Sequence, residues 1–227
     1  MANWKGRGDG MLRGLQLDLT PRSGTVPDFG EFKLVRVDTE TQDQLWKLLM
    51  DTWHYLGAPK TRGPRIKYLI MLGKQPVGAM SYTSGSLRLK DRDSWIGWDD
   101  GERKELLRLC LNQNRFLLLP WIRIRNLASH ILSRSLKQVR SDWMARYGYE
   151  PCLCETFVAD PYRGTCYMAA GWSLVGRTGG YGRQGKNELV YHGNPKQIFM
   201  TVIDRDFLGR FARPADVEPD GGGWANA

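Results

Sequence analysis

The first third of the chain alternates apolar and polar residues in patterns that predict a strand, a helix and a hairpin. Residues 31–37 alternate as a half-buried strand does. Thr39 precedes apolar residues at helical spacing and predicts a capped helix that ends near Trp53. Residues 68–72 and 76–82 predict two strands, and the short turn between them is typical of a hairpin.

The middle of the chain predicts a buried strand that leads into a long helix. Residues 115–119 are a continuous apolar run bounded by Pro120, as in a central strand. Asn126 then suits the N-cap of a helix whose apolar face runs to Trp143 and which ends near Gly148. The remaining predicted elements are strands at 152–158, 173–178 and 196–203 and a short helix at 164–171.

One more helix, capped by Asp99 or Asp100 and running through Leu111, completes the order β-α-β-β-α-β-α-β-α-β-β. Strands and helices mixed in this way predict an α+β domain with a central, mixed and partly parallel sheet flanked by helices. The order resembles the GNAT acetyltransferase fold. In that fold the fourth strand feeds a long helix that holds the pyrophosphate of the cofactor.

The composition is that of one globular domain. The chain has 227 residues, of which 41% are hydrophobic and 25% charged. We expect a flexible lead-in at 1–30, a single domain at 31–212 and a disordered tail at 213–227, because no repeat or linker divides the middle.

The sequence lacks the marks of membrane insertion and secretion. Its best uncharged apolar run, 116–122, is far shorter than the roughly 20 residues that span a bilayer. The first 28 residues carry no apolar signal segment, so we expect a cytoplasmic protein without a membrane partner. The four cysteines lack the spacing of a zinc site or a disulfide framework and are interpreted as buried structural residues.

The net charge of +9 and the sequence pI near 9.5 favour a polyanionic partner, DNA or RNA, although such charge also serves solubility alone. Arg134 and Lys137 lie on the polar face of the predicted long helix. Arg177, Arg183 and Lys186 belong to a Gly-rich basic stretch, interpreted as a flexible loop or a solvated hairpin turn. These five residues are the candidate nucleic-acid contacts.

The turn before the long helix is a candidate phosphate site, because a helix N-terminus presents unpaired N–H groups and a positive dipole end. Its sequence resembles the acetyltransferase pyrophosphate loop R/Q-x-x-G-x-G/A, but Asn126 stands where that pattern has glycine. The alternative is an ordinary N-cap beside two solvated arginines. The candidate cofactor-binding residues are Arg123, Arg125, Asn126, Leu127, Ala128 and Ser129.

Four residues are candidates for proton transfer: His54, Tyr55, Glu155 and Tyr167. A His at a helix C-terminus is also explained by the helix dipole, and a carboxylate within an apolar strand is explained equally by a salt bridge. In acetyltransferase-like folds a tyrosine at the position of Tyr167 acts as a general acid.

Long sequence blocks in a fixed order resemble the DruA-type family, named for a component of the Druantia anti-phage system. The resemblance covers about 32–210. The blocks are HYLG at 54–57, RDSWIGWD at 92–99, NRFLLLPW at 114–121, NLASHIL at 126–132, DWMARYGYEPCLCETFV at 142–158 and RGTCYMAAGW at 163–172. A more distant similarity in pattern is to the phage DNA-modification protein Mom.

These resemblances imply that His54, Tyr55, Ser129, Glu155 and Tyr167 face one cleft. They imply a transferase that acts on DNA or another amine-bearing substrate, with an acyl-coenzyme A or another phosphate-bearing donor. Metal binding by His54 and Tyr55 is a further implication, although the chain has only three histidines. The alternatives are a non-catalytic nucleic-acid-binding component of a defence or transposition system, with defence-system or phage proteins as partners, and a small-molecule acyltransferase.

Overall fold

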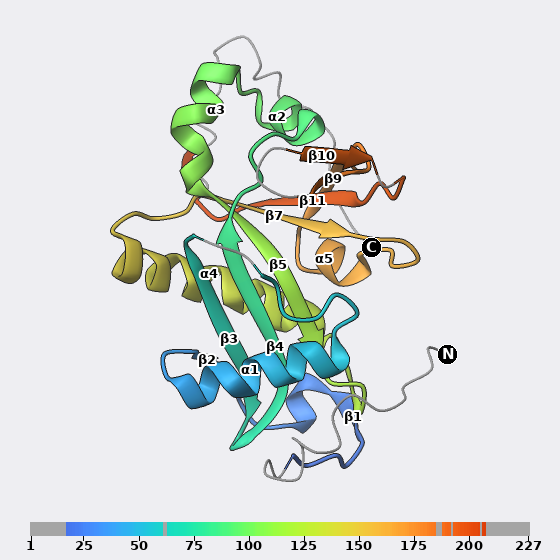
Figure 1. The fold of residues 1–227 in the computed structure, drawn as a ribbon. Helices are drawn as coiled ribbons and strands as arrows, with labels where there is room; N and C mark the ends of the chain where they lie inside the picture. The colour runs from blue at the N-terminus through green and yellow to red at the C-terminus, as the bar shows by residue number, and fades with distance from the viewer. Residues whose placement is uncertain (1–16, 61–62, 185–187, 192, 205, 208–227) are drawn as a thin grey trace, which may run out of the picture.

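A seven-stranded mixed sheet forms the centre of the protein (Figure 1). The computed structural model describes residues 17–60, 63–184, 188–191, 193–204 and 206–207. In chain order the strands of the sheet are β2 (Phe32–Arg36), β3 (Arg65–Leu72), β4 (Gln75–Ser84), β5 (Cys110–Leu118), β7 (Leu153–Val158), β8 (Ser173–Arg177) and β11 (Gln197–Val202). In space they follow the order β2-β3-β4-β5-β7-β11-β8, and β5–β7 is the parallel pair among otherwise antiparallel neighbours. The predicted α+β class with a mixed, partly parallel sheet is confirmed.

Helices cover both faces of this sheet. They are α1 (Glu40–Trp53), α2 (Lys90–Ile96), α3 (Asp100–Leu106), α4 (Leu127–Tyr147) and α5 (Thr165–Ala169), with 3-10 turns η2 (Val26–Asp28) and η3 (Leu107–Leu109). On β3, Lys67 contacts Asp43 of α1, while its neighbour Tyr68 bonds to Asp142 of α4. Successive strand side chains point to opposite faces, so α1 and α4 lie on opposite sides of the sheet, as Figure 1 shows.

Most ends of the helices follow the predicted signals. The Thr39 side chain accepts a hydrogen bond from the backbone of Gln42 and caps α1, and Gly148 ends α4 with φ 78°. The helix expected to run through Leu111 was wrong, because α3 ends at Leu106 and β5 begins at Cys110. Residues 112–115 of β5 are polar, so the apolar pattern did not show where this strand begins.

The lead-in at 1–30, expected to be flexible, contains a strand and core contacts in the part that the structure describes. β1 (Arg22–Thr25) pairs in parallel with β6 (Ile122–Arg125), a short strand just before α4. Leu17, Val26 and Phe29 pack against the hydrophobic core. A pairing between segments so distant along the chain leaves no local periodicity, which explains why the sequence did not predict it.

A second hairpin stands apart from the main sheet. β9 (Tyr181–Gln184) pairs antiparallel with β10 (Glu188–Tyr191). This pairing agrees with the hairpin alternative for the Gly-rich basic stretch. α2 and the β1–β6 pair were the other elements that the sequence did not predict.

The buried hydrophobic residues form two clusters, both of which contain aromatic residues. Trp46 of α1 and Trp143 of α4 are fully buried on opposite faces of the sheet. The indole of Trp46 donates to the backbone oxygen of Met80 at 3.0 Å, which ties α1 to β4. The predicted burial of the cysteines is confirmed for Cys110, Cys152 and Cys154, whereas Cys166 is partly buried. Within the described part of the chain, no helix is long and apolar enough to cross a membrane.

β5 and β7 separate after a short parallel contact, and this separation positions the site. They pair only between 110–112 and 153–155, whereas β7 pairs with β11 along its whole length. On its other side, β5 carries a bulge against β4. Arg115 lies opposite Ser81 and Gln113 opposite Tyr82, so Asn114 is the extra residue. The sheet therefore opens beyond Asn112.

Candidate active site

A cavity of about 620 Å³ lies where β5 and β7 separate. Residues 113–118 of β5 and 156–159 around the end of β7 form its sides. Residues 52–56, at the end of α1, close it from one face of the sheet, and residues 162–167 close it near α5. Concave sites of this size with a few polar groups are typical of ligand binding.

Tyr167 and Gln113 form a buried hydrogen-bonded pair at the wall of the cavity. The Tyr167 phenol donates to Oε1 of Gln113 at 2.7 Å. The hydroxyl of Thr156 on β7 donates to the backbone oxygen of Gln113 at 2.8 Å, so the chain of bonds joins α5, β5 and β7. Burial raises the pKa of Tyr167, which therefore holds its proton at neutral pH.

Close packing fixes the ring of Tyr167. It stacks on Phe199 of β11 with 5.8 Å between ring centroids and meets Trp172 edge-on at 5.2 Å. Gly164 makes this packing feasible, because a Cβ atom there would lie 2.5 Å from the Phe199 ring. Its φ of 66° also favours glycine.

His54 lines the same cavity as a neutral imidazole. Its Nδ1 accepts a hydrogen bond from the backbone N–H of Leu56 at 3.1 Å, so in the neutral ring Nε2 carries the proton. Burial and the nearby Arg115 guanidinium lower the pKa of His54 to about 4. Burial and Arg115 therefore oppose the alternative of a protonated His54 stabilised by the helix dipole.

Tyr55 forms an exposed aromatic surface at the cavity. Its ring stacks on His54 with 4.9 Å between centroids and lies 5.7 Å from the ring of Tyr162, which precedes α5. Both tyrosines are exposed. Across the described residues, no three His, Cys, Asp or Glu side chains come together in a way that would hold a metal ion.

Glu155 is not in this cavity, which corrects the expectation that it faces the same cleft. It is fully buried and forms an ion pair with Arg92 of α2 at 2.9 Å. Its other oxygen accepts from the backbone of Ser86 at 2.6 Å and from the Asn112 amide at 3.0 Å. Period-two alternation put Glu155 on the face opposite Cys154, as it is, but did not reveal that α2 covers that face.

The turn before α4 also lies outside the residues that line the cavity, so Ser129 does not share a cleft with His54. Residues 119–121 and β6 separate this turn from β5. Arg123 and Arg125 are exposed, and neither has an ion-pair partner among the described residues, whereas Leu127 is buried. The segment before β6 contacts the cavity wall through one aromatic pair. Trp53 in the wall packs edge-on against Trp121, with 5.3 Å between ring centroids.

Asn126 occupies the N-cap position of α4, but its side chain makes no capping hydrogen bond. Its φ is 62°, and it is the one non-glycine residue with positive φ in the described part of the chain. Asparagine tolerates this left-handed conformation better than other non-glycine residues. This explains why Asn stands where the pyrophosphate pattern has Gly. The Ser129 hydroxyl donates to the Asn126 carbonyl oxygen at 3.1 Å.

The candidate nucleic-acid contacts are spread over different elements. On α4, Arg134 lies 3.3 Å from Glu31 in an exposed ion pair, and Lys137 is exposed. Arg177, in β8, pairs with Asp160 at 2.9 Å. The side chain of Arg183 and the whole of Lys186 lie outside the described residues.

A protein-family model decides the relationship of this chain. The model of Druantia protein DruA matches residues 15–201, which is most of the chain. The chain belongs to the DruA family. Among curated proteins, no sequence matches this DruA-family chain.

Solved acetyltransferases are similar to the DruA-family chain at low identity. One from Bacillus cereus is 14% identical, covers 76% of this chain and 98% of its own, and has a TM-score of 0.45. An N-acetyltransferase from Staphylococcus aureus is 9% identical, with 77% and 99% covered and a TM-score of 0.47. A Bacillus subtilis acetyltransferase in complex with CoA is 7% identical, with 76% and 97% covered and a TM-score of 0.47.

Several polar residues of the DruA-family site were missed in the sequence. Gln113, Asn114 and Arg115 line the cavity from β5, and Thr156 faces them from β7. The signal was the polar run from 112 to 115 directly before an apolar strand. A strand that changes from polar to apolar along its length indicates one end near a site and the other in the core.

Proposed function

We propose that this DruA-family protein is a transferase of the acetyltransferase type. Its acceptor is DNA or another amine-bearing substrate, in a phage-defence, mobile-element or DNA-modification setting. The observation that carries the proposal is the cavity between β5 and β7, with Tyr167 and His54 in its wall. Both side chains are neutral hydrogen-bond donors at one concave surface. One such donor can act as a general acid, and the other can stabilise an oxyanion.

The proposed donor is an acyl-coenzyme A, and the residues present are compatible with one. The cavity offers apolar side chains at Phe116, Leu117 and Val158 beside the amides of Gln113 and Asn114, which suits an amide-containing aliphatic arm. The diphosphate would be held by the first-turn N–H groups of α4, which lack a side-chain cap, together with the exposed arginines of β6. When bound, such a donor supplies an acyl thioester.

The residues of the chain would then divide the work. Tyr167 holds a proton at its phenol oxygen. It would supply this proton to the sulfur of the leaving thiol, and the proton that the amine gives up on acylation would return to the phenolate. His54 donates from Nε2 to the oxygen on which negative charge develops. Because its Nδ1 is occupied by the Leu56 N–H, His54 acts as a neutral donor rather than as a base.

The test is mass spectrometry of nucleosides from DNA incubated with the protein and acetyl-coenzyme A, with release of free thiol as a second readout. We expect a mass increase of one acyl group in the wild type. Tyr167→Phe and His54→Ala should each reduce the rate by about 10²-fold or more in protein that thermal unfolding shows to be folded. Tyr149→Phe, which lies outside the cavity, is the matched control.

The competing function is a non-catalytic nucleic-acid-binding component. The basic groups without acidic partners around the cavity favour it as the second candidate. If both variants kept full phage protection in cells that carry the complete system, catalysis at this cavity would be rejected and the binding component retained. Acylation of free amines with no effect of DNA would instead indicate a small-molecule acyltransferase.

A further inference from the structure

A second cavity shares a wall with the first. It has a volume of about 470 Å³ and lies against the loop after α1 and the polar half of β5. Residues 113–115 line both cavities, so the same stretch of β5 separates them. A substrate in the second cavity would therefore lie next to the proposed site of acyl transfer.

Four cations line these cavities without a counter-charge: Lys60, Arg115, Arg163 and Lys196. No Asp or Glu is among the lining residues, and none of the four has an ion-pair partner in the described part of the chain. The Arg115 guanidinium is half-buried and donates only to backbone oxygens, those of Gly57 and Asn114, each at 2.7 Å. A partly buried cation without an acidic partner loses hydration that a bound anion would replace, and this applies to Arg115 and Lys196.

The cations also oppose one another. Arg115 lowers the pKa of both Lys196 and His54, in each case together with burial. Burial likewise lowers the pKa of Arg115. An anion bound between Arg115 and Lys196 would relieve this repulsion and offset the cost of removing both groups from water.

The cations behind the sheet are arranged differently. On α4, Arg134 pairs with Glu31, Arg140 with Glu150 at 2.6 Å and Arg146 with Asp38 at 4.0 Å. Neutralised pairs contribute little to binding a polyanion, because their charge is already compensated. The arginines of α4 are therefore compensated, whereas the cations of the two cavities, like Lys137 and the arginines of β6, have no ion-pair partner in the described part of the chain.

Aromatic and amide groups accompany this charge. The exposed rings of Tyr55 and Tyr162 lie 5.7 Å apart at the first cavity. Asn112 and Asn114 face the second cavity with Ser84 and Thr83. Exposed aromatic rings interleaved with cations bind single-stranded nucleic acids, since bases stack on the rings while phosphates meet the cations.

We propose that the two cavities together form the acceptor site for one nucleotide of a single-stranded or locally unpaired nucleic acid. Its phosphate would lie between Arg115 and Lys196, and its base would stack on Tyr55 and Tyr162. The proposal rests on the transferase function above and specifies its acceptor. A base paired within a duplex cannot reach groups at the bottom of a cavity, so the acceptor must be unpaired.

The test is binding of a short fluorescein-labelled oligothymidylate, followed by anisotropy without any acyl donor. Lys196→Gln and Arg163→Gln should each weaken binding at least about threefold. Tyr162→Ala should weaken it about tenfold. These side chains are exposed or half-buried, and thermal unfolding verifies that each variant folds. Lys74→Gln, in the exposed β3–β4 turn, is the matched charge control and should bind as the wild type does.

The outcomes separate this site from its rivals and from the proposed function. Unchanged affinity in Lys196→Gln, Arg163→Gln and Tyr162→Ala would overturn the proposal. Loss of binding in Lys137→Gln alone would also overturn it, because the oligonucleotide would then bind to α4. Equal or tighter binding of the matching duplex would exclude an unpaired acceptor. Because no donor is present, the site can be supported even if no transfer is ever detected, and it can fail while transfer persists.

Discussion

His54 is held neutral by burial and by Arg115, although its place at the end of α1 favours the charged form. The sequence identified His54 as a candidate for proton transfer and left the helix dipole as an alternative explanation for its position. Arg115 reaches His54 from β5, and its guanidinium is fixed on the Gly57 carbonyl oxygen. The proximity of His54 to Arg115 arises from tertiary structure, and it opposes the preference of the helix C-terminus for a charged histidine.

This charge state predicts how stability depends on pH. The folded-state pKa of about 4 lies below the ordinary value of 6.5, so the unfolded chain binds more protons between these pH values. The His54 contribution is therefore fully present above pH 6.5 and is lost as the pH falls towards 4. The difference in free energy of unfolding between wild type and His54→Gln, measured with urea, should shrink steadily across this range. A constant difference would contradict the assigned pKa.

The limits of prediction at this scale were set by burial and by distant contacts. Tyr167 and His54 were found from residue type and position, and the structure places both at one cavity. Gln113 and Arg115 were missed because their roles depend on the opening between β5 and β7. Glu155 was wrongly placed, since its partner Arg92 comes from a helix whose sequence shows no periodic pattern.

At the scale of elements, regular periodicity predicted well and distant pairing did not. α1 begins at a capping residue, Thr39, and α4 ends at a glycine, Gly148. Both helices also have long apolar faces, and both were predicted nearly to the residue. β1 and β6 are four residues each and pair across about half of the chain, which no window of sequence reveals. α2 is also short. Its buried residues are the charged Arg92 and Asp93, so it has no periodic apolar face that the sequence could reveal.

The buried network under α2 predicts a non-additive loss of stability. Arg92 and Glu155 are both fully buried, and Arg92 also bonds to Asp93 at 2.8 Å and to the Ser86 backbone oxygen at 2.6 Å. Arg92→Met leaves a buried carboxylate without its cation and should cost about 3–5 kcal/mol in urea unfolding. The double variant Arg92→Met with Glu155→Met should lose less than the sum of the two single losses.

Additive losses would contradict this network. The comparison also tests the role of Glu155, because Glu155→Gln retains the bond geometry without the charge. If Glu155 acts only by fixing α2 and Asn112, folded Glu155→Gln should transfer acyl groups at close to the wild-type rate. A loss of about 10²-fold in a folded variant would restore Glu155 to the chemistry.

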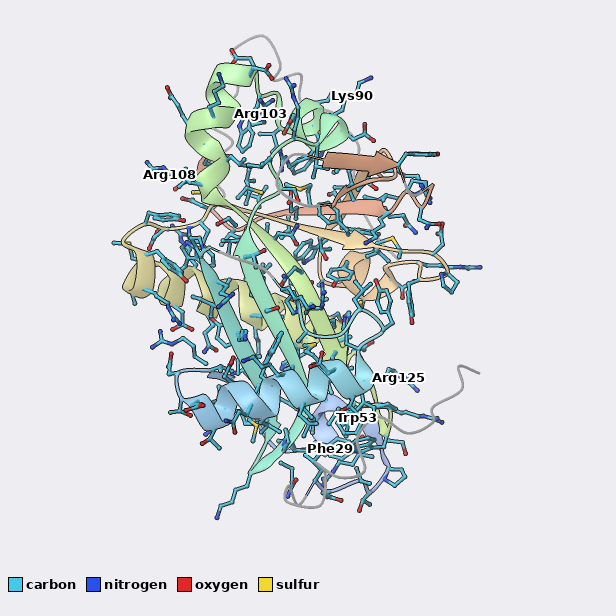
Figure 2. All side chains as sticks on the ribbon, viewed as in Figure 1. Phe29, Trp53, Lys90, Arg103, Arg108 and Arg125 are labelled. Atoms are coloured by element: carbon cyan, nitrogen blue, oxygen red, sulfur yellow. The ribbon has the colours of Figure 1, made fainter. Side chains whose placement is uncertain are left out.

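Across the whole molecule, the charge is unevenly compensated. The two ends differ: Lys90, Arg103 and Arg108 lie near α2 and α3, and Trp53 and Arg125 lie at the opposite end (Figure 2). Two arginines near α2 and α3 have partners, since Arg103 pairs with Asp93 at 3.7 Å and the Arg108 guanidinium lies 5.8 Å from the Tyr149 ring. The net charge of +9 therefore does not measure the surface available to a polyanion.

This distribution predicts the salt dependence of nucleic-acid binding. Affinity should fall as salt rises, because phosphates that bind cations release counterions. If the four unpaired cations of the cavities make the contacts, the slope of log K against log salt for a single strand should be about −3. Use of the whole net charge would give about −6.

Titrations of the labelled oligothymidylate across salt concentrations distinguish these values. Lys74→Gln lowers the net charge by one and should leave the slope unchanged, whereas Lys196→Gln should reduce its magnitude by about 0.7. A slope near −6, or the same slope in both variants, would show that the charge acts as a diffuse field and not through the cavities.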